Sequence, residues 1–187
     1  MQILTFAAST SRQSINGQLI GYAERILDHL SEGAVTIDHL DLNDFEMPIY
    51  SIDRQNEGGI PEAAHEFYRR ITAADGLLIS FAEHNGLYTA AYKNLFDWTS
   101  RIDMRVYQDK PTVMLATSIG ARGGANVLKT AVTSAPFFGN DVRAELSIPR
   151  FGDNFDTKGG TLTDPDLDTQ LRSALAVLLA AAESSDD

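Results

Sequence analysis

The chain has 187 residues, of which 43% are hydrophobic and 9% aromatic, a composition that predicts one globular domain with a substantial core. It has no cysteine, which excludes disulfide scaffolds, thiolate metal sites and cysteine nucleophiles. The net charge of −11 argues against a nucleic-acid partner, because contacts to phosphates need basic side chains. No segment resembles a signal peptide, and no apolar run reaches the roughly 20 residues of a membrane span. We therefore expect a soluble cytoplasmic protein.

Five strand-like runs alternate with helical segments along the chain. The strand-like runs are Gln2–Ala8, Val35–Leu42, Gly76–Ala82, Pro111–Ser118 and Val142–Ile148. The helical patterns are Ser14–Leu30, Pro61–Ala73, Tyr88–Arg101, Gly124–Ala135 and Pro165–Ala182, the last with Asp164 as its expected N-cap. The third and fourth runs are almost continuously apolar, which is typical of a parallel sheet covered on both faces. The order predicts a doubly wound α/β domain over residues 1–183.

Two further stretches are predicted to lie outside the regular elements. Residues Asn43–Gly59 are polar and indicate a long loop, and loops of that length are often functional or mobile. The end of the chain, residues 184–187, is predicted to form a short acidic tail.

In an open α/β sheet, ligands bind beyond the carboxyl ends of the strands, near the point where the strand order reverses. The loops after the first, third and fourth runs therefore matter most. They read STSRQSIN (Ser9–Asn16), EHNGLY (Glu83–Tyr88) and SIGARGG (Ser118–Gly124), and we call them the first, second and third loops.

The first loop has hydroxyl side chains and one arginine, Arg12, at the start of a helix. A helix N-terminus presents unpaired N–H groups and a favourable dipole to an anion such as a phosphate. The alternative is that Ser11 or Ser14 only caps the helix, which needs a single hydroxyl. Both interpretations stay open from this loop alone, although the number of hydroxyls favours the anion.

Other chemistries find little support in the sequence. The third loop is glycine-rich but lacks G-x-G-x-x-G spacing, so it is equally consistent with a simple turn into a helix. No G-x-x-x-x-G-K-[ST] or G-x-S-x-G motif occurs, which argues against P-loop nucleotidases and α/β hydrolases. The four histidines lack metal-ligand spacing, so no metal is expected, and His84 is the only one in a candidate loop.

Together, the three loops resemble the NADPH-dependent FMN reductase family, which includes quinone-, chromate- and azo-reducing enzymes. The segment AEHNGLYTAAYKNLFDWTSR (Ala82–Arg101) resembles the family's Pro-Glu-Tyr-Asn loop and the helix that follows it. SIGARGG resembles the family's Ser-Pro-Gly-Gly-x-Gly-Gly loop, and the opening resembles Ser-x-Arg-x-x-Ser-x-Asn. The chain departs from the family where Ser11 takes the place of the arginine, with Arg12 next to it, and where His84 replaces the tyrosine.

The resemblance implies a flavodoxin-like fold, a five-stranded parallel sheet with helices on both faces. It also implies FMN as cofactor and NADPH or NADH as electron donor. Carried over position by position, it names these residues as FMN-binding: Ser9, Ser11, Arg12, Ser14 and Asn16; Glu83, His84, Asn85 and Gly86; and Ser118, Gly120, Ala121, Gly123 and Gly124. No side chain need act as acid or base when the donor reduces the flavin, so no catalytic residue is named.

The implied function is an oxidoreductase that passes two electrons to quinone-, flavin- or azo-type acceptors. One alternative is a flavodoxin-like electron carrier without reductase activity of its own, and another is a non-enzymatic flavin-binding partner. The resemblance also implies a homodimer or homotetramer. Trp98 is then either a core residue or part of a subunit interface.

Overall fold

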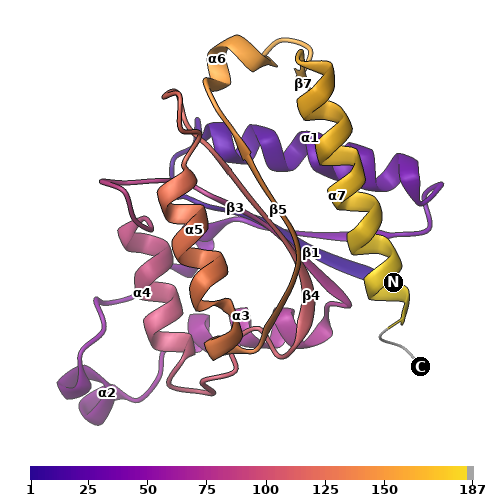
Figure 1. Ribbon diagram of the computed structural model, residues 1–187. Coiled ribbons are helices and arrows are strands. Elements are labelled where there is room, and N and C mark those ends of the chain that lie inside the picture. The colour runs from indigo at the N-terminus through magenta and orange to yellow at the C-terminus, as the bar shows by residue number, and fades with distance from the viewer. Residues whose placement is uncertain (185–187) are drawn as a thin grey trace.

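The computed structural model describes residues 1–184, and its centre is a twisted sheet of five parallel strands (Figure 1). In spatial order these are β2 (Thr36–Leu40), β1 (Gln2–Ala8), β3 (Gly76–Phe81), β4 (Lys110–Thr117) and β5 (Asn140–Ile148). The five predicted runs all form strands, which confirms the predicted flavodoxin-like sheet. Every residue of β3 is buried, as expected of a central strand covered on both faces.

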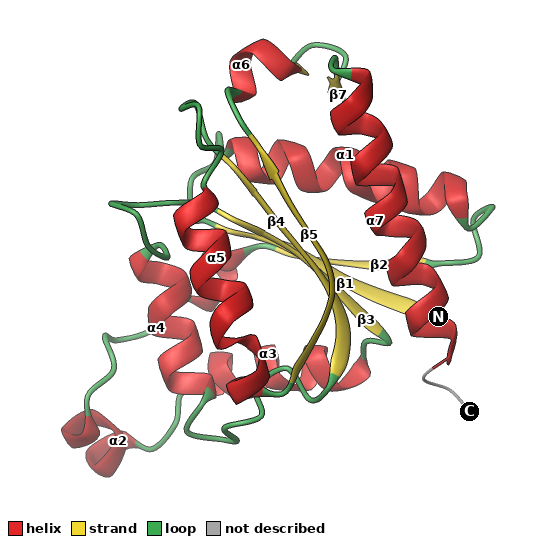
Figure 2. Cartoon of the chain, viewed as in Figure 1, coloured by secondary structure: helices red, strands yellow, loops and turns green. Residues whose placement is uncertain are grey.

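Helices cover both faces of the sheet and enclose two separate cores (Figure 2). One face carries α1 (Ile15–Leu30) and α7 (Pro165–Glu183), which pack on each other and on the sheet. The other face carries α3 (Glu62–Ala73), α4 (Ala90–Thr99) and α5 (Ala125–Ser134). The amphipathic spacing seen in the sequence is the cause of this arrangement, because each helix buries one apolar stripe.

The predicted loop over Asn43–Gly59 is wrong in part, because it contains two short helices. A 3-10 helix, η1 (Leu42–Phe45), follows β2 at once, so the strand ends at Leu40 rather than at Leu42. The helix α2 (Ile52–Gly58) is capped by the Ser51 hydroxyl and has no buried residue. It therefore lacks the apolar periodicity that reveals a helix in sequence. Figure 1 shows α2 projecting away from the sheet at the lower left.

The last third of the chain adds small elements that the sequence did not predict. They are η2 (Ala135–Phe138), α6 (Phe151–Asn154) and a two-stranded antiparallel ribbon of β6 (Phe155–Asp156) and β7 (Thr161–Leu162). The predicted cap of the last helix is confirmed, since the Asp164 carboxylate accepts from the N–H groups of Asp166 and Leu167. Residues 185–187 of the predicted tail lie outside the described residues, and the single domain over 1–183 stays a prediction. Within residues 1–184, no helix is long and apolar enough to cross a membrane.

Candidate flavin site

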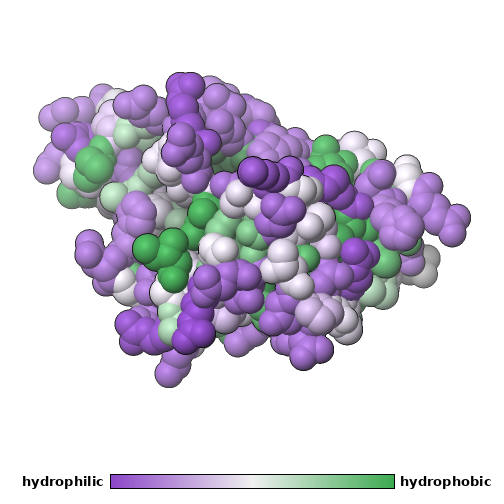
Figure 3. Space-filling view, turned by 90° about the horizontal axis from the view of Figure 1, so that it is seen from above, coloured by the Kyte–Doolittle hydropathy of each residue, from purple (hydrophilic) through white to green (hydrophobic). Residues whose placement is uncertain are grey.

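The three loops meet at the carboxyl edge of the sheet, around a cavity of about 270 Å³. They follow β1, β3 and β4, which are neighbours in the strand order. Viewed from above, the surface is largely hydrophilic with a few separate hydrophobic patches (Figure 3). The cavity is lined by Ser9, Ser11, Gln13, Ser14, Ile15, Asn16, Ala82, Glu83, His84, Thr117, Ser118 and Ile119.

The first loop both caps α1 and leaves donors free. The Ser14 hydroxyl accepts from the Gly17 N–H at 3.1 Å, so this serine is the N-cap. The Ser9 hydroxyl accepts from the Ser11 N–H, and the side chains of Ser11 and Arg12 make no hydrogen bond within residues 1–184, although the charge of Arg12 is near enough to Asp41 to help lower the pKa of that carboxyl. In the same part of the chain, these backbone N–H groups of the loop and of the first turn of α1 have no acceptor: Thr10, Arg12, Gln13, Ile15 and Asn16.

Asn16 lies under the loop rather than on its surface. Its side chain is 2% exposed, and its Oδ1 accepts from the Ser80 hydroxyl and from the Thr117 N–H. Its Nδ2 donates to the Thr117 carbonyl. Because the protein itself engages both ends of this amide, Asn16 ties the start of α1 to β3 and β4.

The second loop is a tight two-residue hairpin. The N–H of His84 donates to the Leu87 carbonyl at 3.0 Å, and the N–H of Leu87 donates to the His84 carbonyl at 3.1 Å. Asn85 and Gly86 between them have φ of 53° and 83°, the left-handed pair that Asn-Gly hairpins favour. The turn is therefore rigid, and it holds an exposed His84 at the rim of the cavity.

Glu83 faces the same cavity and also reaches α5. Its Oε2 accepts from the N–H groups of Asn126 and Val127, each at 3.0 Å. This carboxylate therefore joins the second loop to the helix that follows the third loop.

Two glycines of the third loop, Gly123 and Gly124, are required by the structure for different reasons. A Cβ on Gly123 would lie 2.5 Å from the Ser147 hydroxyl and 2.7 Å from the Ile148 carbonyl carbon, so β5 itself demands glycine there. Gly124 has φ of +80° as the N-cap of α5. By contrast, Gly120 and Ala121 are exposed, and the N–H groups of residues 119–122 have no acceptor in the described chain. The exposed part of the loop thus offers backbone donors, while Gly123 and Gly124 shape the turn.

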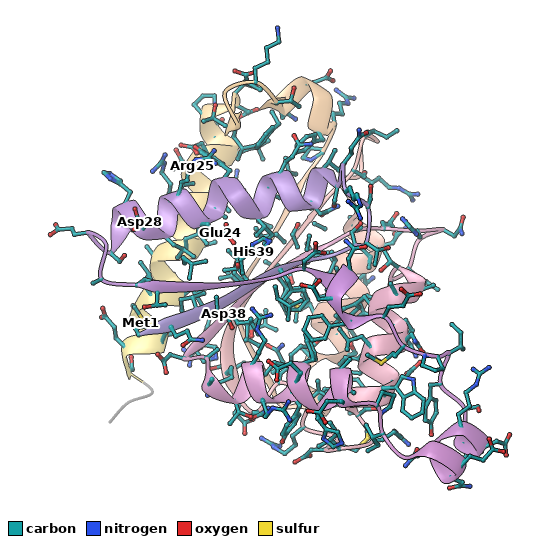
Figure 4. All side chains as sticks on the ribbon, turned by 180° about the vertical axis from the view of Figure 1, so that it is seen from behind. Met1, Glu24, Arg25, Asp28, Asp38 and His39 are labelled. Atoms are coloured by element: carbon teal, nitrogen blue, oxygen red, sulfur yellow. The ribbon has the colours of Figure 1, made fainter. Side chains whose placement is uncertain are left out.

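A second cavity of about 470 Å³ lies beside the first loop, toward β2 and η1, and Arg12, His39 and Asp41 are among its lining. Figure 4 shows His39 of β2 and Glu24 of α1 close to one another, and His39 Nδ1 is 2.6 Å from Glu24 Oε1. This hydrogen bond raises the pKa of His39. The pKa of Asp41 is lowered, mainly because its carboxylate accepts from the Asn43 N–H. No cluster of three metal-ligating side chains occurs among the residues that the structure describes.

The sequence did not reveal what Asn94 and Trp98 contact. Asn94 Nδ2 donates to the carbonyls of Met47 and Pro48, and its Oδ1 accepts from the Tyr50 N–H. Trp98 is 1% exposed, which confirms a core position, and its Nε1 donates to the Pro48 carbonyl at 2.7 Å. These two side chains therefore hold the segment that leads into α2. The Lys-Asn and Asp-Trp pairs of the helix were the only sequence signal for them.

The donor set at the first loop fits the phosphate of FMN. A dianion needs several short donors, and the free hydroxyl of Ser11, the Arg12 side chain and the open N–H groups at α1 supply them. The flat ring of the flavin has polar edge atoms, which the unpaired N–H groups of the third loop can bind. The site thus offers anion donors at one end and backbone donors at the other.

Comparisons with known proteins give the same picture. The model of the NADPH-dependent FMN reductase family matches residues 1–151. The chain is 28% identical over 185 residues, 97% of its length and 89% of the relative's, to the probable NADPH:quinone oxidoreductase 2 of Oryza sativa subsp. japonica. It is 34% identical over 126 residues to the 2-hydroxy-1,4-benzoquinone reductase of a Burkholderia species, spanning 67% of the chain and 64% of that protein.

A solved structure shows the same fold over nearly the whole chain. The flavoenzyme NAD(P)H:(acceptor) oxidoreductase FerB of Paracoccus denitrificans superposes with a TM-score of 0.73 at 22% identity, covering 98% of this chain and 97% of that one. With the family match over residues 1–151, these findings place the protein: the chain belongs to the NADPH-dependent FMN reductase family and is an FMN-dependent oxidoreductase that uses NAD(P)H.

Proposed function

We propose that this protein passes two electrons from NAD(P)H to quinone-, flavin- or azo-type acceptors. The observation that carries the proposal is the unequal state of two helix ends, that of α1 in the lining of the cavity and that of α5 behind Glu83. The N–H groups of Ile15 and Asn16 at the start of α1 have no acceptor within residues 1–184, whereas the first N–H groups of α5 are all bonded within the protein. An anion is therefore best bound at the first loop, which leaves the flavin ring to the second and third loops.

Different groups of residues would bind different parts of FMN. Ser9, Ser11, Arg12 and Ser14 would hold the phosphate, and the backbone of residues 118–121 would bind the polar edge of the ring. Asn16, Glu83, Gly123 and Gly124 keep these groups in place through contacts within the protein. His84, Asn85 and Gly86 would border the ring.

When bound, FMN supplies the redox chemistry, taking a hydride from NAD(P)H and giving two electrons to the acceptor. The loops around the cavity would leave the flavin ring accessible. The hairpin after β3 carries exposed His84 and Asn85, and Ile119 of the third loop is 85% exposed. No Phe, Tyr or Trp of the described residues lines this cavity, which leaves room for a flat donor or acceptor. Two of the relatives described above are named as quinone reductases, which supports a quinone as the acceptor.

The second candidate, an electron carrier, would bind FMN but would not react with NAD(P)H at useful rates. A sequential mixing experiment separates the two. The FMN-loaded protein is reduced anaerobically with NADPH or NADH and then mixed with benzoquinone, an azo dye or free FMN. Reoxidation of the protein by a stoichiometric amount of at least one acceptor supports the reductase. Reduction by dithionite alone would instead favour the carrier.

We further propose that the protein forms a homodimer or homotetramer through the groove between α4 and α5. This groove encloses about 330 Å³ and is lined by Tyr88, Tyr92, Phe96, Tyr107 and Phe138, among others. Met104 in its lining is 52% exposed, and Phe137, the chain neighbour of Phe138, is 78% exposed. Closed homo-oligomers usually bury such self-complementary apolar patches. Light scattering of the FMN-loaded protein at micromolar concentration tests this, and a monomer would contradict it.

The lack of a nucleic-acid partner and the cytoplasmic location stay predictions. The net charge of −11 supports the first, since nonspecific binding to phosphates needs cationic surfaces.

A further inference from the structure

The N-terminus of α5 is fully satisfied by hydrogen bonds, although its N-cap is a glycine without a side chain. The N–H of Ala125 donates to the Arg122 carbonyl at 2.9 Å, and that of Leu128 donates to the Gly124 carbonyl at 3.1 Å. The two N–H groups between them, of Asn126 and Val127, both donate to Glu83 Oε2. The helix end is therefore capped from a loop more than forty residues earlier in the chain.

The start of α1 lines the cavity described above, and this end of α5 borders it through Glu83. Glu83 lines the cavity, and behind it lies the first turn of α5. On the other side, Ser14 and Ile15 line the cavity at the first turn of α1, where the N–H groups of Ile15 and Asn16 have no acceptor among residues 1–184. The start of α1 thus lines the cavity with open N–H groups, whereas the start of α5 is separated from the cavity by the Glu83 carboxylate that occupies its donors.

Both ends would attract a phosphate if both were open. A helix N-terminus carries about half a positive charge and several unpaired donors, which suits a dianion. FMN has a phosphate at one end and a flat ring at the other, so two open helix ends would allow two opposed orientations. The carboxylate of Glu83 already uses the donors of α5, and its negative charge repels a second anion.

We propose that Glu83 is a specificity-determining residue that reserves anion binding in this cavity for α1 and so fixes the orientation of FMN. The proposal rests on the proposed binding of FMN in this cavity. Glu83 is a positioning residue in this account, because it acts through the start of α5.

A purely structural cap is the alternative, and it predicts a different result. If Glu83 only caps a helix end that has no affinity for phosphate, its loss would lower the melting temperature without adding a phosphate site. A residue that excludes anions would, when shortened, also open a new binding place for phosphate. Counting bound phosphate in the protein without FMN therefore distinguishes the two, and it does not depend on enzyme activity.

The probe is inorganic phosphate, titrated into the FMN-free protein by calorimetry and followed by ³¹P NMR. The wild type should bind one equivalent, and FMN should displace it. Glu83→Ala should bind a second equivalent, because the Asn126 and Val127 N–H groups become free. Glu62→Ala is the matched control, since it removes one exposed carboxylate from the first turn of α3 and changes the net charge equally. It should bind one equivalent.

A second variant keeps the test decisive if Glu83→Ala does not fold. Glu83→Gln retains an oxygen that can accept from α5 but removes the charge that faces the cavity. It should still bind one phosphate, about two- to fivefold more tightly than the wild type, the size expected for one charge near a helix end. One equivalent for Glu83→Ala, or wild-type affinity for Glu83→Gln, would overturn the proposal. Failure of the wild type to bind either FMN or phosphate would instead overturn the proposed function.

Discussion

The side-chain amide of Asn16 pairs with both backbone groups of Thr117. Nδ2 donates to the Thr117 carbonyl at 3.2 Å, and Oδ1 accepts from the Thr117 N–H at 3.1 Å. The Ser80 hydroxyl donates to the same Oδ1 at 2.8 Å. One side chain thus sets the start of α1 against the ends of β3 and β4, the strands that lead into the second and third loops. The three loops keep their relative positions in part because of this residue.

Replacement of Asn16 by alanine should lower the free energy of unfolding by about 2–4 kcal/mol even without FMN. The change leaves buried polar groups of Thr117 and Ser80 without partners, and each such group costs about 1–3 kcal/mol. Urea denaturation of the FMN-free protein measures this. Gln18→Ala on the exposed side of the same helix is the control and should stay within about 0.5 kcal/mol. If Asn16→Ala were as stable as this control, the positioning role would be wrong.

Ser11 and Ser14 should respond differently to alanine, although both lie in the first loop. Ser14 caps α1, so Ser14→Ala should lower the free energy of unfolding by about 1 kcal/mol and also weaken the binding of FMN. The Ser11 hydroxyl has no partner in the described part of the chain, so Ser11→Ala should leave stability unchanged. This variant should lower the affinity for FMN about tenfold or more, because it loses one hydrogen bond to a charged group.

Riboflavin provides the control for this pair, because it lacks the phosphate. Fluorescence titration should show that Ser11→Ala binds riboflavin as the wild type does. Equal losses of affinity for FMN and for riboflavin would show that the first loop does not bind the phosphate.

Asn94→Ala should loosen the segment before α2. Three hydrogen bonds join the Asn94 side chain to Met47, Pro48 and Tyr50, and the helix α2 beyond them has no buried residue to hold it. Hydrogen exchange should therefore speed up at the Tyr50 amide and through α2, with little change in β1. Lys93→Ala is a suitable control on the same helix, because within residues 1–184 the Lys93 side chain bonds only to Asp97. Unchanged exchange at Tyr50 would contradict this role.

The pair of His39 and Glu24 should make stability weakly pH-dependent. The hydrogen bond to Glu24 raises the pKa of His39 in the folded state, so the charged form is favoured by folding. The stabilisation that His39 contributes is therefore complete below the pKa of the unfolded state, about 6.5. It is lost as the pH rises through the higher pKa of the folded state. The His39 side chain is 53% exposed, which limits the effect to below about 1 kcal/mol.

The measurement is the difference in unfolding free energy between the wild type and His39→Gln, which does not titrate. This difference should be larger near about pH 6 than at alkaline pH. A difference that grows with pH would contradict the assignment.

The order of strands and helices could be predicted because apolar patterning is local. The continuous apolar run of β3 and the periodic stripe of α1 each lie within one stretch of sequence. α2 was missed because it buries no residue, and β6 and β7 because two residues are too few to show a pattern. The physical signal for these elements lies in capping and in contacts with distant parts of the chain.

In the candidate site, too, local features could be predicted from the sequence and long-range contacts could not. The hydroxyls of the first loop and the Asn-Gly turn of the second are visible in the sequence, since their chemistry is local. The partners of Asn16 and Glu83 are not, because Thr117 lies 101 residues after Asn16 and Asn126 lies 43 after Glu83. Resemblance to the family named both as FMN-binding, and the structure assigns their side chains to bonds within the protein.

The central claim, that NAD(P)H reduces FMN held in this cavity, is tested most directly by anaerobic titration of the FMN-loaded protein with NADPH and with NADH. The absorbance of the bound flavin in the visible range is followed. One equivalent of at least one nicotinamide should bleach it completely, since a hydride carries both electrons. A flavin that dithionite bleaches but that neither NADPH nor NADH reduces would contradict the account.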